Sequence, residues 1–364
     1  MYRSHLVLSS FFSITLSSSD NCRDPYYSPF SSDSIWLTPI GSNAQYMDAG
    51  LFRNKSYPPN DFFSDDDYFI VTKDTDPVFP WYNQGWWGTN GNLTHCDVIG
   101  HYVNTLHFPA NLSVTAFGNN NAAGILQPDN DTLILTQPLY KCNETAPILS
   151  IYAQWKGTNN GTLSIRSNGT YGGHGGSGLS AIGGTIRLGE LLPNTPPISH
   201  ALKLELWAHI YYYAQNPCYN WPANTCDGYH NNCPDDPIAC YGGTNPYLTP
   251  GSLLAIPVNI SEQLNNTLTT IPAKKILYAL TYYGGYLVDD TYWNRATFCT
   301  MHGVTDEFQA YYNYSFNTSP NSPFYNDLLL IFQNLAIVIN NSPTSIGGGG
   351  TPLQPLAPPL CTYN

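Results

Sequence analysis

Short apolar runs separated by turn residues are the feature that most constrains the fold of this chain. From Cys22 to about Ile346, runs rich in β-branched and aromatic residues alternate with Gly, Asn, Pro and Asp. The runs are DYFIVTKD, HYVNTLHF, NLSVTAF, DTLILTQ, APILSIYAQW, HALKLELWAHIYYY, SLLAIPVNI and YGGYLVDD. Regularly spaced short strands with turn signals are typical of β-sandwiches. We therefore predict a mainly β protein with a jelly-roll-like sandwich.

Two segments depart from the strand pattern. Residues 272–283 and 323–335 each begin with a proline and carry apolar residues at helical spacing. Each leads directly into a short strand, so we predict two short helices packed on the sandwich. No linker divides residues 21–346, which we assign to one large domain. An amphipathic segment, residues 1–20, precedes it, and residues 347–364 form a Gly- and Pro-rich tail that we expect to be extended and anchored near Cys361.

The low charge content excludes several classes of partner. Only 10% of the 364 residues are charged, against about 25% in an ordinary soluble domain. The net charge is -12 with 13 Lys and Arg, so the chain lacks the basic residues that neutralise phosphates. We expect no nucleic acid or anionic membrane partner. No run of 18 apolar residues predicts a transmembrane helix.

Glycosylation sequons indicate an extracellular location. The chain has 36 Asn, and chance predicts roughly half of the N-x-[ST] sequons that are present. Such sequons mark exposed loops of secreted proteins. The twelve acceptors are Asn54, Asn92, Asn111, Asn130, Asn143, Asn160, Asn168, Asn259, Asn265, Asn313, Asn317 and Asn340.

Nine cysteines agree with an oxidising compartment. Four lie in a loop-like stretch, at Cys218, Cys226, Cys233 and Cys240, and the other five are Cys22, Cys96, Cys142, Cys299 and Cys361. The gaps within the four do not match the C-x2-C pairs of zinc sites, so a disulfide-stapled surface loop is favoured, with three pairings open. Because nine is odd, at least one thiol is free or bonded to another chain.

The amino terminus permits two interpretations. LVLSSFFSITLSSS follows Arg3 and His5 as in a secretory signal peptide. Its apolar residues also alternate as in a strand with one buried face, at Leu6, Leu8, Phe12, Ile14 and Leu16. A strand of this kind can complete the sheet of a neighbouring copy. Five such side chains contribute on the order of 10 kcal/mol before association costs.

Metal and phosphate sites receive little support from the sequence. His95, His101 and His107 recur every six residues, about 20 Å apart along a strand, too far for one ion. An acidic run, Asp61, Asp65, Asp66, Asp67, Asp74 and Asp76, permits calcium but lacks EF-hand spacing. The stretch YGGHGGSGLSAIGG has no P-loop lysine and is interpreted as a tight turn. We therefore predict no metal and no cofactor beyond N-linked glycans.

A scattered set of ionisable residues in the most apolar half contains the catalytic candidates. They are Arg187, Glu190, His200, Glu205, His209, Asp227, Asp289 and Asp290. A carboxylate pair beside a histidine suits glycoside hydrolysis or lyase chemistry, whereas buried ion pairing is the alternative. Aromatic residues offer a sugar-stacking surface, at Trp81, Tyr82, Trp86 and Trp87, joined by Tyr211, Tyr212 and Tyr213.

Several runs together resemble one family of secreted microbial proteins. They are PFSSDSIWLTPIG, YFIVTKDTDPVFPWYNQGWWG, GGTIRLGELL, ISHALKLELW, GGTNPYLTPGSLLAIP, YGGYLVDDTYW and SIGGGGTPLQPLAPP, from about Pro29 to Pro359. The resemblance implies a β-sandwich fold and brings no established activity or catalytic residues. The dense sequons, the four-cysteine loop and the amphipathic start depart from that family.

The sequence as a whole predicts a secreted glycoprotein that is a structural subunit of an extracellular filament or surface layer. Copies of the chain would join by donating residues 6–16 as a strand. The alternatives are a carbohydrate-active enzyme that uses Glu190, His200 and Asp289 or Asp290, and a glycan-binding module.

Overall fold

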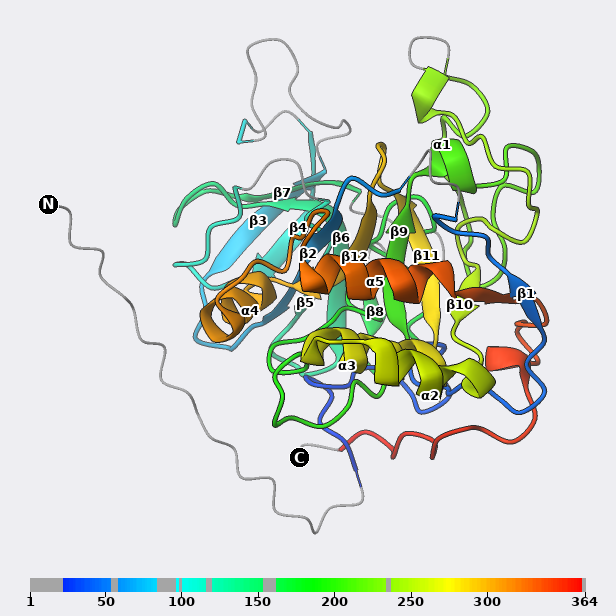
Figure 1. Ribbon diagram of the computed structural model, residues 1–364. Coiled ribbons are helices and arrows are strands. Elements are labelled where there is room, and N and C mark those ends of the chain that lie inside the picture. The colour runs from blue at the N-terminus through cyan, green and yellow to red at the C-terminus, as the bar shows by residue number, and fades with distance from the viewer. Residues whose placement is uncertain are drawn as a thin grey trace, which may run out of the picture.

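A large mixed sheet forms the centre of the protein (Figure 1). The structure is a computed structural model that describes residues 22–53, 58–83, 96–97, 100–115, 120–152, 162–233 and 237–361. Its strands are β1 (Tyr46–Asp48), β2 (Phe62–Val71), β3 (Val78–Asn83), β4 (His101–His107), β5 (Ala123–Leu126), β6 (Thr132–Tyr140), β7 (Ile148–Tyr152), β8 (Thr162–Ser164), β9 (Leu202–Leu206), β10 (Leu253–Ala255), β11 (Gly285–Asp290), β12 (Ala296–Met301) and β13 (Ala336–Val338). The helices are α1 (Ala208–Tyr211), α2 (Val258–Thr267), α3 (Ile271–Tyr282), α4 (Val304–Tyr312) and α5 (Pro323–Gln333), with 3-10 turns η1 (Pro237–Ala239) and η2 (Ile346–Gly348). The mainly β class predicted from the sequence is confirmed.

The order of the strands does not follow a jelly roll. The path runs β1-β13-β10-β11-β9-β12-β2-β5-β6-β7-β3-β4, and β8 pairs with β6. Parallel pairs join β11 to β9, β12 to β2, β2 to β5 and β3 to β7. A jelly roll is built from antiparallel strands. The predicted jelly-roll arrangement is therefore not confirmed.

Helices α5, α3 and α2 lie side by side in front of the sheet (Figure 1). The two predicted helices are confirmed as α3 and α5, and each leads into a strand, β11 and β13. The Ser322 hydroxyl caps α5 by accepting from the Tyr325 N–H at 3.0 Å. The sequence did not predict α2 and α4, in which few residues are buried.

Each central strand contributes to two different layers. On β9, Leu202, Leu204 and Leu206 belong to the apolar core beneath the helices, which also contains Ile276 and Phe332. Burying each of these side chains contributes about 1.5–3 kcal/mol. The alternate residues of β9 must face the opposite side of the sheet, because side chains on a strand alternate.

A second apolar core lies against that opposite face. It contains Trp36 and Tyr286, whose rings meet edge to face at 5.5 Å between centroids. Leu135 and Val288 pack in the same core. All five residues of β9 are buried, so its charged residues lie between two apolar layers rather than in solvent.

The two ends of the described chain are tied together. Cys22 and Cys361 form a disulfide, and Arg23 pairs with Leu360. Figure 1 shows the first blue segment beside the last red one. The tail is thus anchored at Cys361, as predicted.

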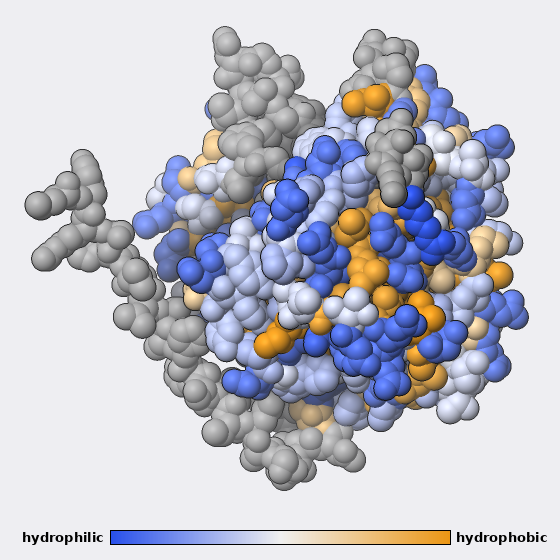
Figure 2. All heavy atoms as spheres, in the orientation of Figure 1, coloured by the Kyte–Doolittle hydropathy of each residue, from blue (hydrophilic) through white to orange (hydrophobic). Residues whose placement is uncertain are grey.

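One face of the protein carries a band of apolar side chains among polar ones (Figure 2). The view is that of Figure 1, with the helices in front. Val258, which begins α2, and Ile271, which begins α3, are among the exposed apolar residues. Over the described residues, the helices are too short or too polar to cross a membrane.

Candidate functional site

Four neighbouring strands place polar side chains on one buried face of the sheet. Cys299 of β12 pairs in register with Asp65 of β2, and Thr297 of β12 pairs with Glu205 of β9. A register shift in β11 after Leu287 brings Asp289 opposite Glu205. A bulge of this kind turns a side chain to the other face of its strand. We call the resulting group the buried polar centre; it consists of Asp65, Asp67, His174, Lys203, Glu205, Asp289 and Cys299, all buried.

A glycine-rich loop, residues 171–184, covers the buried polar centre. Its close packing against the centre explains why it is rich in glycine. His174 lies in this loop, and its N–H donates to the Leu179 carbonyl at 3.0 Å. A Cβ on Gly175 would stand 2.7 Å from Asp289 Oδ2, and one on Gly176 would stand 2.8 Å from Asp289 Oδ1. Gly176 also has φ +55°, a conformation that favours glycine. The interpretation as a tight turn was incomplete, because the loop also delivers His174.

One ammonium group faces the carboxyl groups of the centre. Lys203 Nζ lies 2.6 Å from Asp67 Oδ2 and donates to the Ala181 carbonyl at 2.6 Å. The Thr185 hydroxyl donates to Asp67 at 2.6 Å. Asn120 donates its backbone N–H to Asp65 at 3.0 Å and its amide to Asp289 at 3.1 Å. These contacts provide hydrogen-bond partners for only some of the polar atoms in the centre.

The imidazole of His174 stands among three acids and a thiol. Its Nε2 lies 3.4 Å from Cys299 Sγ, 3.7 Å from Glu205 Oε1 and 3.8 Å from Asp67 Oδ1. Its Nδ1 lies 3.7 Å from Asp289 Oδ2. The nitrogen–oxygen separations exceed the 2.7–3.2 Å of ordinary N–H···O hydrogen bonds. Within the described residues, His174 Nδ1, Asp67 Oδ1 and both amide atoms of the adjacent Gln137 are buried without a hydrogen-bond partner.

Burial sets the protonation of this centre. It raises the pKa of Glu205 well above its usual range, and the nearby Asp65 and Asp289 add to the shift. Burial raises the pKa of Asp67 to about 7, although Lys203 opposes the shift. It also lowers the pKa of His174 well below its usual value, as the Lys203 charge does. The imidazole is therefore neutral at neutral pH.

A small pocket borders the centre. It is lined by Asp67, Phe69, Ile182, Thr185, Arg187 and Met301 and holds about 10 Å³ of free space. That is room for about one water molecule. Of the buried polar centre, Asp67 is the member that lines this pocket.

The predicted catalytic residues fall into separate networks. Glu190 accepts from His200 at 3.1 Å and lies 3.7 Å from Arg187. Burial raises the pKa of Glu190, but the charge and hydrogen bond of His200, with Arg187, outweigh it and hold that pKa below its usual value. Glu205 and Asp289 belong instead to the buried polar centre. The candidates Glu190 and Asp289 therefore have different partners.

The other catalytic candidates contact the loops that follow β9 and β11. Asp290 accepts from the N–H groups of Ala208 at 2.8 Å and Tyr292 at 2.9 Å. Burial raises the pKa of Asp290 to about 7. Asp227 accepts from the Tyr241 hydroxyl at 2.6 Å. His209 stacks at a tilt on Trp207, 5.2 Å between centroids, and joins neither network.

The acidic run does not gather into one oxygen-rich loop. Asp61 pairs with Arg295 at 3.0 Å. Asp65 and Asp67 point into the buried polar centre, whereas Asp66, on the other face of β2, lies 3.3 Å from His302. Among the described residues, these aspartates therefore do not come together as one calcium site. Asp74 is exposed and Asp76 accepts from the nearby Lys73 N–H at 2.8 Å.

The aromatic surface is only partly described. Trp81 is 1% exposed and donates its indole N–H to Ser150, so it belongs to the core. Trp86 and Trp87 lie outside the described residues, as does His95. Tyr212 is buried, and its hydroxyl donates to the Asp289 carbonyl at 2.5 Å. Trp81 and Tyr212 therefore cannot stack on a sugar as predicted.

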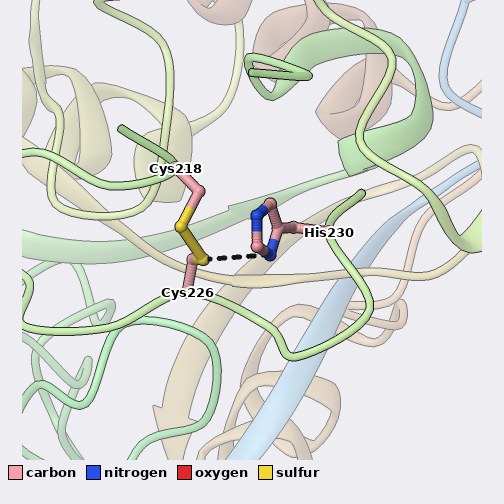
Figure 3. A group of neighbouring side chains, drawn as sticks. All are labelled: Cys218, Cys226 and His230. Atoms are coloured by element: carbon pink, nitrogen blue, oxygen red, sulfur yellow. Dashed lines mark hydrogen bonds between the residues drawn. A yellow bond between two sulfur atoms is a disulfide. The ribbon is translucent and has the colours of Figure 1, made fainter. Parts of the chain in front are cut away.

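The four-cysteine loop closes locally. Disulfides join Cys218 to Cys226 and Cys233 to Cys240, and another joins Cys96 to Cys142. Figure 3 shows His230 beside the first of these bonds, with Nδ1 3.4 Å from Cys226 Sγ. Both sulfurs are used in the disulfide, so this group is not a thiolate metal site. The predicted stapled loop is confirmed, and the odd cysteine is Cys299, whose burial excludes a bond to another chain.

Nine of the twelve sequon asparagines lie within the described residues, and Asn54, Asn92 and Asn160 lie outside them. Eight of these nine are exposed; the ninth, Asn340, is half-buried. The Asn340 amide donates to the carbonyls of Asn43 and Gly348 at 3.0 Å each. That nitrogen is the atom to which an N-glycan would be attached.

Comparisons with protein-family models, curated proteins and solved structures found no match. The family resemblance and the functions inferred from the sequence therefore stay predictions.

Sequence reasoning missed the buried polar centre as a unit. It had singled out Glu205 and Asp289 as catalytic candidates and Asp65 and Asp67 as acidic-run members, but His174, Lys203 and Cys299 were not connected to them. The available signal was β9 itself, where LKLEL places two charges in a chain with only 10% charged residues.

Proposed function

We propose that this chain is a secreted, N-glycosylated structural protein, a subunit of an extracellular filament or surface layer. The observation that carries the proposal is the exposure of eight of the nine described sequon asparagines. An acceptor amide must be accessible for a glycan to be accommodated in the folded protein. Glycans at these positions would supply the surface polarity that a chain with few charged residues lacks.

The disulfides support the same location. Eight of the nine cysteines form four intrachain bonds, a state that persists in oxidising compartments. Two of the bonds fix the loop of residues 218–240, whose described part, residues 218–233 and 237–240, contains little regular structure. Covalent bonds of this kind favour durability outside the cell.

Assembly would occur through the N-terminal segment. Its apolar residues Leu6 to Leu16 lie outside the described residues, but the segment joins the body at Cys22, which is bonded to Cys361. Mechanical force on a donated strand would therefore be transmitted to the folded domain at the Cys22–Cys361 disulfide. Among the described strands, β1 and β4 end the sheet path; β4 is the longer, with 7 residues against 3, and is largely exposed, so we propose β4 of a neighbouring copy as the acceptor edge.

The carbohydrate-active alternatives have less support. An enzyme would need Glu190, His200 and Asp289 or Asp290 in one cleft. Glu190 binds both His200 and Arg187, while Asp289 lies in the buried polar centre and Asp290 accepts from backbone N–H groups. A glycan-binding surface could not include Trp81, because this side chain is buried in the core.

The test compares assembly of the full chain with matched variants, by electron microscopy and sedimentation. We expect Phe12→Asp, which places a charge on the apolar face of the segment, to abolish fibres or layers. Ser13→Asp, on the opposite face, should leave them intact. Equal assembly by both variants, or by a chain that lacks residues 1–20, would refute strand donation.

A further inference from the structure

We propose that one divalent cation of the zinc class binds in the buried polar centre. Its ligands are the side chains of Asp65, His174, Glu205 and Cys299. Each offers one donor atom, and the four atoms all lie within 4.8 Å of one another. The inference does not depend on the proposed function, since it concerns an interior site that holds the fold together.

The spacing of the donor atoms fits a coordination polyhedron. An ion with bonds of about 2.0–2.3 Å in tetrahedral geometry separates its ligands by about 3.3–3.7 Å. The edges formed by His174, Glu205 and Cys299 are 3.4, 3.5 and 3.7 Å. Nitrogen and oxygen atoms at these separations are too far apart for good hydrogen bonds. They are at the right separation to share an ion.

Unpaired polar atoms point to the same conclusion. His174 Nδ1 and Asp65 Oδ2 are buried and lack hydrogen-bond partners within the described residues. Burying polar atoms without a partner is unfavourable, so such atoms usually have one. With Nε2 on an ion, His174 Nδ1 would carry the ring proton and face Asp289 Oδ2, now 3.7 Å away. A carboxylate behind a metal-bound histidine is the usual outer arrangement.

Charge also favours a cation. Asp65, Asp67, Glu205 and Asp289 place four carboxyl groups beside one ammonium, that of Lys203. A divalent cation would offset two of these negative charges.

The donor set selects the class of ion. One thiolate sulfur, one imidazole nitrogen and two carboxylate oxygens suit Zn²⁺ better than calcium or magnesium, which take oxygen ligands. Four protein ligands without an open position are typical of structural rather than catalytic zinc. The ion would also protect Cys299, the one free thiol in the chain. We therefore assign it a stabilising role.

The first experiment measures metal in the natural full-length chain, purified without chelators, by inductively coupled plasma mass spectrometry. We expect close to one zinc-class ion per chain. The chain is then unfolded with chelator and refolded with Zn²⁺, with Co²⁺ or without metal, and melting temperatures are compared. A native chain without transition metal, whose metal-free form gains no stability from either ion, would overturn the proposal.

Co²⁺ identifies the ligands. A thiolate bound to Co²⁺ gives a near-ultraviolet charge-transfer band, which Cys299→Ser should abolish. Glu205→Gln keeps the side-chain shape and should lower affinity by roughly tenfold or more. Asp66→Asn, on the opposite face of β2, is the matched control and should bind as the natural chain does. A band that survives Cys299→Ser, or Glu205→Gln affinity equal to that of the control, would place any ion elsewhere and refute this site.

Discussion

Replacing Lys203 by methionine should destabilise the protein strongly. Lys203 is fully buried, and its ammonium lies 2.6 Å from an Asp67 oxygen. Removing one partner of a buried ion pair leaves the other charge uncompensated, which costs about 3–5 kcal/mol. Unfolding entropy near 2.1 cal/mol/K per residue gives roughly 0.8 kcal/mol/K for this chain. The melting temperature should therefore fall by about 4–6 °C in calorimetry.

Two further variants isolate the ion pair. Lys73→Met removes an exposed lysine and should change stability by less than about 0.5 kcal/mol. The double variant Lys203→Met/Asp67→Leu removes both charges, so it should be more stable than the sum of the two single changes predicts. A Lys203→Met cost below about 1 kcal/mol, or strict additivity in the double variant, would refute the argument that the pair is buried and coupled.

Three other predictions follow from local geometry. Gly176→Ala should cost more than Gly50→Ala, measured by urea unfolding, because both have positive φ but only Gly176 would place a Cβ against Asp289; equal costs would contradict the close packing. The pKa of Glu190 is lowered, so its contribution to stability is present above about pH 4.5 and is lost as pH falls through the folded-state value. The natural chain should thus lose stability more steeply than Glu190→Gln on acidification, and parallel curves would argue against the bond with His200. Mass spectrometry of tryptic glycopeptides should find glycans at exposed sequons and none at Asn340, whose amide is engaged; a fully occupied Asn340 would show that this region folds differently.

The sequence predicted those elements whose signals are local. A proline followed by helically spaced apolar residues located α3 and α5 correctly. Helix α2 was not predicted because Leu264 is its one buried residue, so its sequence shows no apolar face at helical spacing. The four-cysteine loop was likewise recognisable, because its bonds close within eight residues.

Non-local features could not be predicted from the chain. The parallel pairing of β12 with β2 joins residues more than two hundred positions apart, and no local pattern specifies it. The alternation in LKLEL resembles a strand with one solvated face. The structure buries Lys203 and Glu205 because the glycine-rich loop covers them, a contact that depends on the whole fold. The buried polar centre therefore emerges only when four strands and this loop meet.

The most direct test of the proposed function is electron microscopy of the natural secreted protein, combined with mass spectrometry of its amino terminus. We predict regular fibres or layers whose subunits retain residues 6–16 and carry N-glycans. Isolated particles that begin near Ser19 or Asp20 would contradict the account, since the segment would then be a cleaved signal peptide and could not join subunits.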